Sequence, residues 1–180
     1  DAAGMVVCDS QDKLQSRKSM GYVRDVFQQR HMEKLVGNYG IGHVRYPTAG
    51  GAGKEFAQPM YVNSPYGISL AHNGNLTNSK ELAVQLFHAE MRHLNTDSDS
   101  EVLLNIFAHE LGKQREIYPS ADHIFKAVAK THRRCDGAYA VLALITGHGI
   151  LAFRDSNGIR PLSIGIRKGA KRDEYIIASE

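Results

Sequence analysis

The distribution of apolar residues divides the chain into a strand-rich beginning, a helical middle and a strand-rich end. Short apolar and β-branched runs predict strands at 5–9, 39–46, 60–63 and 68–72. Apolar residues three and four positions apart predict helices at 22–35, 79–93, 98–113 and 120–134. Further apolar runs predict strands at 138–146, 150–154, 161–167 and 174–179.

This order of elements predicts the fold class. Tight turns, such as 64–67 and 147–149, join neighbouring strands and favour antiparallel pairing. The helices are grouped together and do not alternate with single strands, which excludes a doubly wound parallel sheet. We therefore expect one α+β domain over residues 1–180, built in layers around largely antiparallel sheet.

Composition narrows the class of protein. The chain has 180 residues, of which 42% are hydrophobic, and its formal charge is +3. Its basic residues are scattered, which is typical of a solvated surface, with an anion-facing rim as the alternative; nucleic-acid binding modules carry a denser basic stripe. No apolar run is long enough to cross a membrane and no signal peptide is recognisable, so we expect no membrane partner.

The cysteines and the ends of the sequence add two expectations. Cys8 and Cys135 are the two cysteines, and they fit a reduced, cytoplasmic protein with structural thiols, although one disulfide remains open. The chain opens without Met on apolar sequence and closes on a predicted strand. We therefore expect it to begin partway into its domain.

A first polar patch follows the strand predicted at 39–46. The segment GHVRYPTAG at 42–50 places Arg45 at the end of that strand and Thr48 beyond a proline turn. The planar guanidinium of an arginine suits a carboxylate, and the threonine hydroxyl adds a small donor. The alternative is a surface arginine paired with an acidic side chain.

A second patch is the segment AHNGNLTN at 71–78. Asn73 and Gly74 form the commonest tight-turn dipeptide, so a plain turn is one interpretation. The other is an oxyanion hole, in which an amide side chain and a backbone N–H donate to a developing negative charge. Glycine suits that role because a ligand can approach its backbone closely.

A third patch places carboxylates at the start of the helix predicted at 98–113. Asp97, Asp99 and Glu101 favour a helix N-terminus electrostatically, and Ser98 with Glu101 has the capping-box spacing. One of them could instead hold an ammonium group. The nine histidines show no metal-binding spacing and the EF-hand pattern is absent, so we expect no metal site.

Taken together, the patches offer an arginine for an α-carboxylate, an aspartate for an α-ammonium and two donors for an oxyanion. This set fits an amino acid with a reacting side-chain carbonyl, and glutamine is the natural candidate.

The same segments resemble the glutaminase domain of the amidophosphoribosyltransferases, within the class-II glutamine amidotransferases. The resemblance is carried in order by GHVRYPTAG (42–50), NSPYG (63–67), AHNGNLTN (71–78), SDSE (98–101), GAYA (137–140) and FRDSNGIRPL (153–162). It implies an N-terminal-nucleophile hydrolase fold, a four-layer α-β-β-α sandwich of two mainly antiparallel sheets, incomplete at its N-terminus.

The resemblance also implies roles for individual residues. Arg45 would bind the glutamine α-carboxylate with Thr48 supporting it, and Asp99 would hold the ammonium. The side chain of Asn73 and the N–H of Gly74 would form the oxyanion hole. The family's nucleophile is a cysteine at the mature N-terminus, ahead of the segment that Asp1 begins here, so we expect this chain alone to lack glutaminase activity.

For the whole enzyme, the resemblance implies the first step of de novo purine synthesis. Ammonia from glutamine would react with phosphoribosyl pyrophosphate in a separate phosphoribosyltransferase domain, which needs magnesium and is absent from residues 1–180. No cofactor is expected in the present domain, and the full-length enzyme is expected to be a cytoplasmic homo-oligomer. The alternative is a non-catalytic glutamine-binding or regulatory module.

Overall fold

A computed structural model describes residues 1–46 and 53–180, and every sheet within that part is antiparallel. The first sheet has the order β2-β1-β3, with strands Leu14–Met20, Ala2–Cys8 and Tyr39–Arg45. The second has the order β4-β5-β6-β7, with strands Met60–Val62, Ile68–Leu76, Gly137–Ile145 and Gly149–Arg154. Among the strands that the structure describes, β8 (Ser163–Arg167) and β9 (Glu174–Ala178) pair only with each other.

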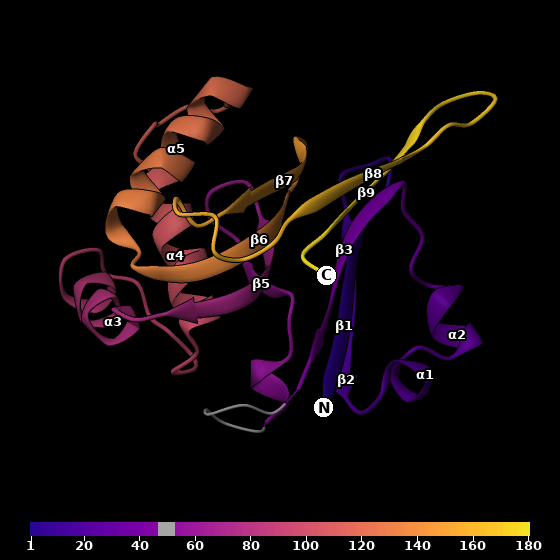
Figure 1. Ribbon diagram of the computed structural model, residues 1–180, viewed down its shortest axis with the longest axis horizontal. Coiled ribbons are helices and arrows are strands. Elements are labelled where there is room, and N and C mark those ends of the chain that lie inside the picture. Colours follow the sequence, from indigo (N-terminus) through magenta and orange to yellow (C-terminus); the bar gives the residue numbers. More distant parts are fainter. Residues whose placement is uncertain (47–52) are drawn as a thin grey trace.

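Three helices cover one face of the second sheet (Figure 1). They are α3 (Ser79–His88), α4 (Asp99–Gly112) and α5 (Ala121–Arg134). Helix α4 lies at the centre and its apolar side chains are almost completely buried, which explains why its sequence is apolar around most of its circumference. Its residues and those of β5, β6 and β7 form the main hydrophobic core.

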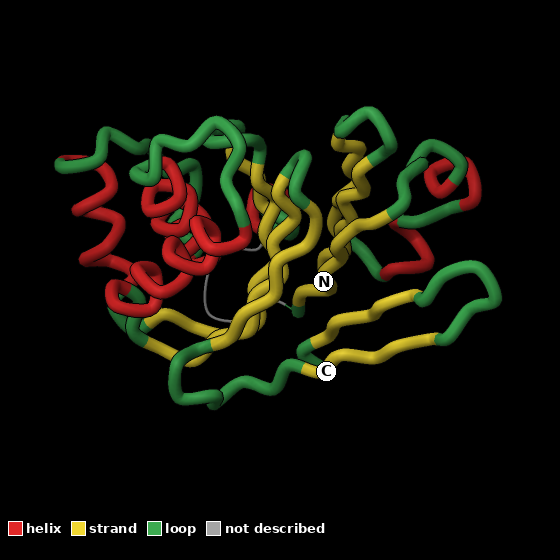
Figure 2. Tube along the Cα trace, turned by 90° about the horizontal axis from the view of Figure 1, so that it is seen from above, coloured by secondary structure: helices red, strands yellow, loops and turns green. Residues whose placement is uncertain are grey.

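The two larger sheets pack against each other. Val6 and Ile41 from the first sheet and Ala71 and Leu144 from the second form a smaller buried cluster between them. The short helices α1 (Val23–Val26) and α2 (Gln29–Met32) lie on the far side of the first sheet (Figures 1 and 2). This sequence of layers confirms the predicted α+β sandwich of antiparallel sheets.

The region around residues 14–35 differs from prediction. The single helix predicted at 22–35 is wrong, because two separate turns of helix form there and Phe27 between them has φ −110° and ψ 80°. Only Val26 of these two helices is buried, so no apolar face drives a continuous helix. Strand β2 was not predicted, since its largely polar sequence has no apolar alternation and pairing with β1 holds it in place.

A buried ionic cluster joins the three helices. Arg134, at the end of α5, donates to Glu90 beyond α3 (Nη2–Oε1 2.6 Å) and to Glu110 in α4 (Nη1–Oε1 2.9 Å). Lys113 adds a contact of 3.1 Å to Glu110 from the surface. The side chains of both glutamates are at least nine-tenths buried, so the arginine neutralises charge that water cannot reach.

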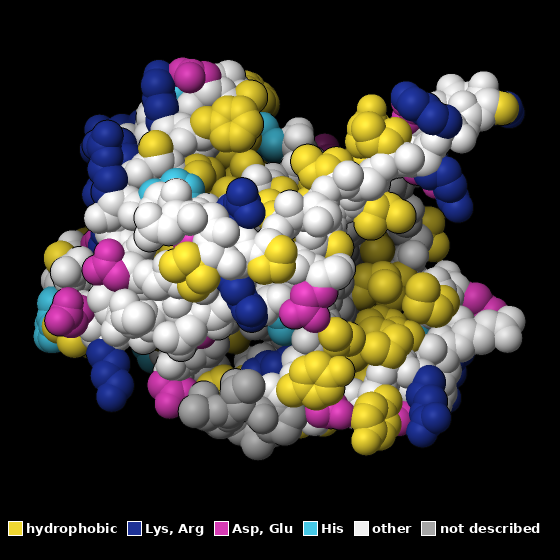
Figure 3. All heavy atoms as spheres, viewed as in Figure 1, with side chains coloured by type: hydrophobic (Ala, Val, Ile, Leu, Met, Phe, Trp, Pro, Cys, Tyr) yellow, Lys and Arg dark blue, Asp and Glu magenta, His cyan; other side chains and the backbone are white. Residues whose placement is uncertain are grey.

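The β8–β9 hairpin extends from the body of the protein (Figures 1 and 2). Its side chains Ile164, Ile166, Tyr175 and Ile176 are exposed by 55% to 68%. Apolar side chains also gather beside it on the face in Figure 3. Within the described residues, no helix is both long and apolar enough to cross a membrane.

Candidate functional site

A cavity of about 680 Å³ lies where the ends of β3 and β5 meet the start of α4. Four of the residues predicted from the sequence line it, namely Arg45, Asn73, Gly74 and Asp99. The fifth, Thr48, lies outside the described residues. Segments that are distant in sequence therefore bring the predicted arginine, amide, glycine and carboxylate to one place.

Strand β5 presents the backbone of Gly74 at an open edge. The N–H of His72 turns away from β6 and donates to Gln58 Oε1 at 2.7 Å, and the N–H of Leu76 donates to Asp99 Oδ2 at 2.9 Å. Because backbone direction alternates along a strand, the N–H of Gly74 points to the same edge, between these two donors. It is thus directed toward the cavity that Gly74 lines.

Only glycine fits at position 74. Its φ is +155°, and a Cβ atom there would lie 2.1 Å from the carbonyl oxygen of Ala138 and 2.7 Å from Cα of Tyr139. Those atoms belong to the backbone of β6 and cannot turn aside. The tight-turn interpretation of Asn73 and Gly74 is wrong, because both residues lie within β5 and are paired with β6.

Asp99 is held at the first position of α4. Its Oδ2 accepts from Leu76, and its Oδ1 lies 3.5 Å from Ser100 Oγ and 3.9 Å from His72 Nδ1. The side chain of Asp99 is 22% exposed, so the carboxylate still reaches the cavity. A fixed, partly buried carboxylate can accept from an ammonium group there.

The predicted capping box at the start of α4 is wrong in part. Ser98 does cap the helix, because its side chain accepts from the N–H of Ser100. Glu101 turns the other way and accepts from the backbone N–H groups of Asn95 and Thr96, each at 2.8 Å. It therefore fixes the loop that leads into the helix and the cavity.

Arg45 ends β3 and enters the cavity from the first sheet. Its Cζ atom lies 5.4 Å from the centre of the Phe56 ring, which orients the guanidinium by a cation–π contact. A planar group held in this way can receive a carboxylate with two parallel hydrogen bonds.

A buried polar network forms part of the cavity lining and was not predicted. Gln58 Nε2 donates to Ser100 Oγ at 3.0 Å, and His72 Nδ1 lies 3.0 Å from the same oxygen. Burial, together with the nearby His43 and Arg160, lowers the pKa of His72 to about 4 against the opposing effect of Asp99, so the imidazole is neutral at pH 7. The network ties β5 to the start of α4.

Arg160 is a second unpredicted residue of the cavity. Its Nη2 donates to the side-chain carbonyl oxygen of Asn73. The amide nitrogen of Asn73 donates in turn to Ser179 Oγ at 2.9 Å and to Glu180 Oε1 at 3.1 Å. The segment FRDSNGIRPL carried the resemblance, but the sequence indicated only a turn there.

Neither cysteine lines the cavity. Cys8 is fully buried in β1, and Cys135 is buried at the end of α5, where burial raises its thiol pKa to about 12. Both are free thiols in the structure, and their burial agrees with the predicted structural role. Among the described residues, no group of three or more His, Cys, Asp and Glu side chains is arranged to hold a metal ion.

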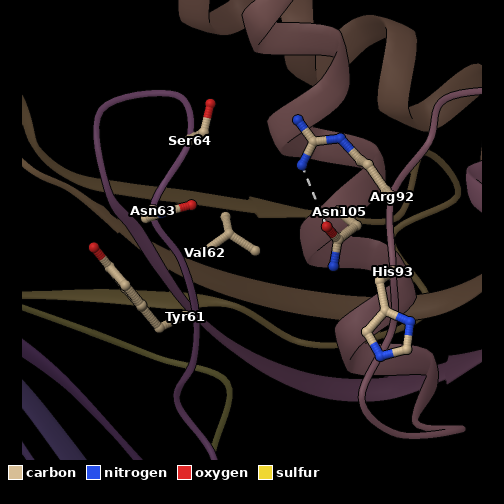
Figure 4. Close-up of a pocket in the computed structure, with 7 residues that line it drawn as sticks. All are labelled: Tyr61, Val62, Asn63, Ser64, Arg92, His93 and Asn105. Atoms are coloured by element: carbon tan, nitrogen blue, oxygen red, sulfur yellow. Dashed lines mark hydrogen bonds between the residues drawn. The ribbon is translucent and has the colours of Figure 1, made fainter.

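A smaller hollow of about 380 Å³ lies between β4 and the loop after α3 (Figure 4). Arg92 Nη1 donates there to Asn105 Oδ1 at 3.3 Å. Tyr61 and His93 also line it, and none of the predicted site residues that the structure describes is among its lining. The larger cavity is therefore the candidate site.

One known family matches most of this chain. Residues 51–180 match the family model described as a glutamine amidotransferase domain, which is most of the chain. The chain belongs to the glutamine amidotransferase domain family. The description of that family agrees with the predicted use of glutamine. The predicted sandwich fold agrees with a solved amidotransferase structure.

Individual relatives are more specific. The amidophosphoribosyltransferases of Pseudomonas aeruginosa and Escherichia coli are 60% and 58% identical to this chain over its whole length. The chain spans 36% of the length of each. The structure of glutamine phosphoribosylpyrophosphate amidotransferase from B. subtilis, complexed with ADP and GMP, has a TM-score of 0.77 and 33% identity; the match covers 99% of this chain and 35% of that one.

Proposed function

We propose that this glutamine amidotransferase domain supplies ammonia within an amidophosphoribosyltransferase. The observation that carries the proposal is that Arg45, Asn73, Gly74 and Asp99 line one cavity. The relatives named amidophosphoribosyltransferase favour this function over a non-catalytic binding module.

Glutamine is the substrate we propose for the cavity. Arg45 would bind its α-carboxylate with two hydrogen bonds, and Asp99 would accept from its α-ammonium group. Thr48 would add a contact beside the carboxylate. With both charged groups on the α-carbon held, the side-chain amide would lie along the edge of β5.

The reaction we propose is acyl transfer through a cysteine thiolate. The thiolate attacks the amide carbon, and the carbonyl oxygen becomes an oxyanion that accepts from the Asn73 side chain and the Gly74 N–H. The C–N bond then breaks, the nitrogen takes a proton and leaves as ammonia, and water hydrolyses the thioester to glutamate. Buried Cys8 and Cys135 do not suit this role, so we assign it to the family's N-terminal cysteine.

For the whole protein, we propose that the ammonia attacks phosphoribosyl pyrophosphate in a phosphoribosyltransferase domain and gives 5-phosphoribosylamine. Magnesium would belong to that domain, and this one would need no cofactor. We further propose a homo-oligomer in the cytoplasm that binds neither nucleic acid nor membrane. Because the chain spans 36% of its relatives, these statements concern the full-length protein.

The test uses the full-length protein and measures ammonia release from glutamine with and without phosphoribosyl pyrophosphate. We expect release in the wild type and a raised KM for glutamine in Arg45→Met, because the carboxylate loses its partner. The exposed Arg133→Met in α5 is the matched control. Absence of ammonia release in the wild type would refute the proposal.

A further inference from the structure

We propose that Arg160 is a positioning residue that fixes the side-chain amide of Asn73 with its NH2 group toward the cavity. The proposal rests on the function proposed above and assigns a role in it to a residue outside the predicted set. The oxygen and the NH2 group of an amide side chain have nearly the same size, so packing alone does not fix which of them faces the cavity.

The hydrogen bonds decide this orientation. The carbonyl oxygen of Asn73 accepts from Arg160 Nη2, and the amide nitrogen donates to Ser179 Oγ at 2.9 Å and Glu180 Oε1 at 3.1 Å. A guanidinium has donors and no acceptor. If the amide turned over, its NH2 would face the donors of Arg160 and its oxygen would face the carboxylate of Glu180, so both of these hydrogen bonds would be lost. The Ser179 hydroxyl could turn and donate to the oxygen, so the orientation is decided by Arg160 and Glu180.

The orientation matters for the chemistry. An oxyanion needs donors, and the Asn73 side chain offers them only at its nitrogen end. In this structure a carboxylate oxygen of Glu180, a residue that lines the cavity, accepts from that nitrogen, so this end of the amide can bind an anionic oxygen. A turned amide would instead place its carbonyl oxygen against the developing charge.

Arg160 is itself held by a rigid turn. The carboxylate of Asp155, which is 3% exposed, accepts from the backbone N–H groups of Tyr139 (3.2 Å), Ile159 (2.8 Å) and Arg160 (3.1 Å). Burial alone would raise the pKa of Asp155, but these donors outweigh it and lower the pKa. The Asp155 carboxylate therefore stays ionised and holds the turn after β7 closed. Its bond to Tyr139 also joins this turn to β6, the strand beside Asn73.

The experiment measures steady-state glutaminase activity in the full-length protein. We expect Arg160→Met to lower kcat by about 10- to 100-fold with little change in KM for glutamine, since a turned amide removes one oxyanion donor. Arg160→Lys, which keeps a donor without an acceptor, should recover most of the rate. Arg160→Gln, which can present either end of its amide, should not.

A double-mutant cycle separates positioning from other roles. Asn73→Ala should itself lower kcat by roughly 100- to 1000-fold. In that background Arg160→Met should have almost no further effect, because the group on which it acts is gone. The exposed Arg133→Met is the control for loss of one positive charge.

Several outcomes would overturn the proposal. One is an undiminished effect of Arg160→Met in the Asn73→Ala background, and another is a change in KM alone, which would make Arg160 a direct substrate contact. Equal rates for the Lys and Gln variants would also overturn it. Each leaves the proposed function intact, whereas a wild type without glutaminase activity overturns both.

Discussion

Replacing Arg134 by methionine should destabilise the fold strongly. The substitution keeps an unbranched side chain but leaves the buried carboxylates of Glu90 and Glu110 without the contacts of 2.6 and 2.9 Å. Breaking a buried ion pair by removing one partner costs about 3–5 kcal/mol. At roughly 2–4 °C per kcal/mol for a domain of this size, the Tm should fall by about 6–20 °C.

The loss should also depend on pH. Burial by itself would raise the pKa of Glu110, but hydrogen bonds from Arg134 and Lys113 outweigh it and lower the pKa. This carboxylate therefore stabilises the wild type above its unfolded pKa of about 4.3, and the contribution disappears as the pH falls through the lower folded value. In the variant Lys113 still donates to Glu110, but the hydrogen bond and the charge of Arg134 are lost. The pKa of Glu110 should therefore be higher than in the wild type, and the penalty of the substitution should grow as the pH rises from about 4.

Urea unfolding followed by circular dichroism at pH 4.5 and 7.5 measures both effects. The difference in unfolding free energy between wild type and Arg134→Met should be larger at pH 7.5. Substitution of its exposed neighbour, Arg133→Met, should change the unfolding free energy of the wild type by less than about 0.5 kcal/mol. A penalty below about 1 kcal/mol, or one that is equal at the two pH values, would refute the assignment of a buried ionic cluster.

Three further predictions concern the site and the thiols. Gly74→Ala should abolish glutaminase activity and lower the Tm, because the new Cβ would lie 2.1 Å from the Ala138 carbonyl oxygen. A crystal structure with an unchanged backbone at this position, or a Tm equal to that of the wild type, would contradict this. Asp99→Asn should raise the KM for glutamine by about 10- to 100-fold in steady-state assays, whereas the exposed Asp122→Asn should not. The thiol of Cys135, with its pKa raised to about 12 by burial, should react with a disulfide reagent at pH 8 only after denaturation, and rapid labelling of the folded protein would argue against that burial.

Prediction from sequence worked where local pattern reflects burial. The apolar run 138–146 was predicted as a strand because β6 lies at the centre of its sheet and is buried. Strand β2 was missed for the opposite reason, because it lies at the edge of its sheet, is largely unburied and pairs with β1 alone among the described strands. The end of α3 at His88, earlier than the predicted 93, depends on how the following loop folds back, with the N–H of Arg92 donating to the Leu86 carbonyl.

The site likewise contains residues that could be predicted from the sequence and residues that could not. Arg45, Asn73 and Gly74 stand in segments whose chemistry is suggestive but left plainer alternatives open. The resemblance to a family assigned their roles, and it also selected Asp99 among three nearby carboxylates. Their roles remain predictions, although their meeting in one cavity agrees with them. The supporting residues could not be predicted, because Gln58 meets Ser100 across 42 positions and Arg160 meets Asn73 across 87, and no spacing in the sequence encodes such contacts.

The end of the β8–β9 hairpin forms one wall of the cavity, so the local stability of the hairpin affects the cavity. A two-stranded ribbon is marginally stable by itself, and β8 and β9 pair with no other described strand. Yet Ile177 and Ala178 at the end of β9 line the cavity, as do the two residues that follow. One wall of the cavity thus belongs to the segment with the least support, so its amide hydrogens should exchange with solvent well before those of β5 and β6. A ligand in the cavity that contacts this wall should slow that exchange, which makes the hairpin a natural reporter of occupancy.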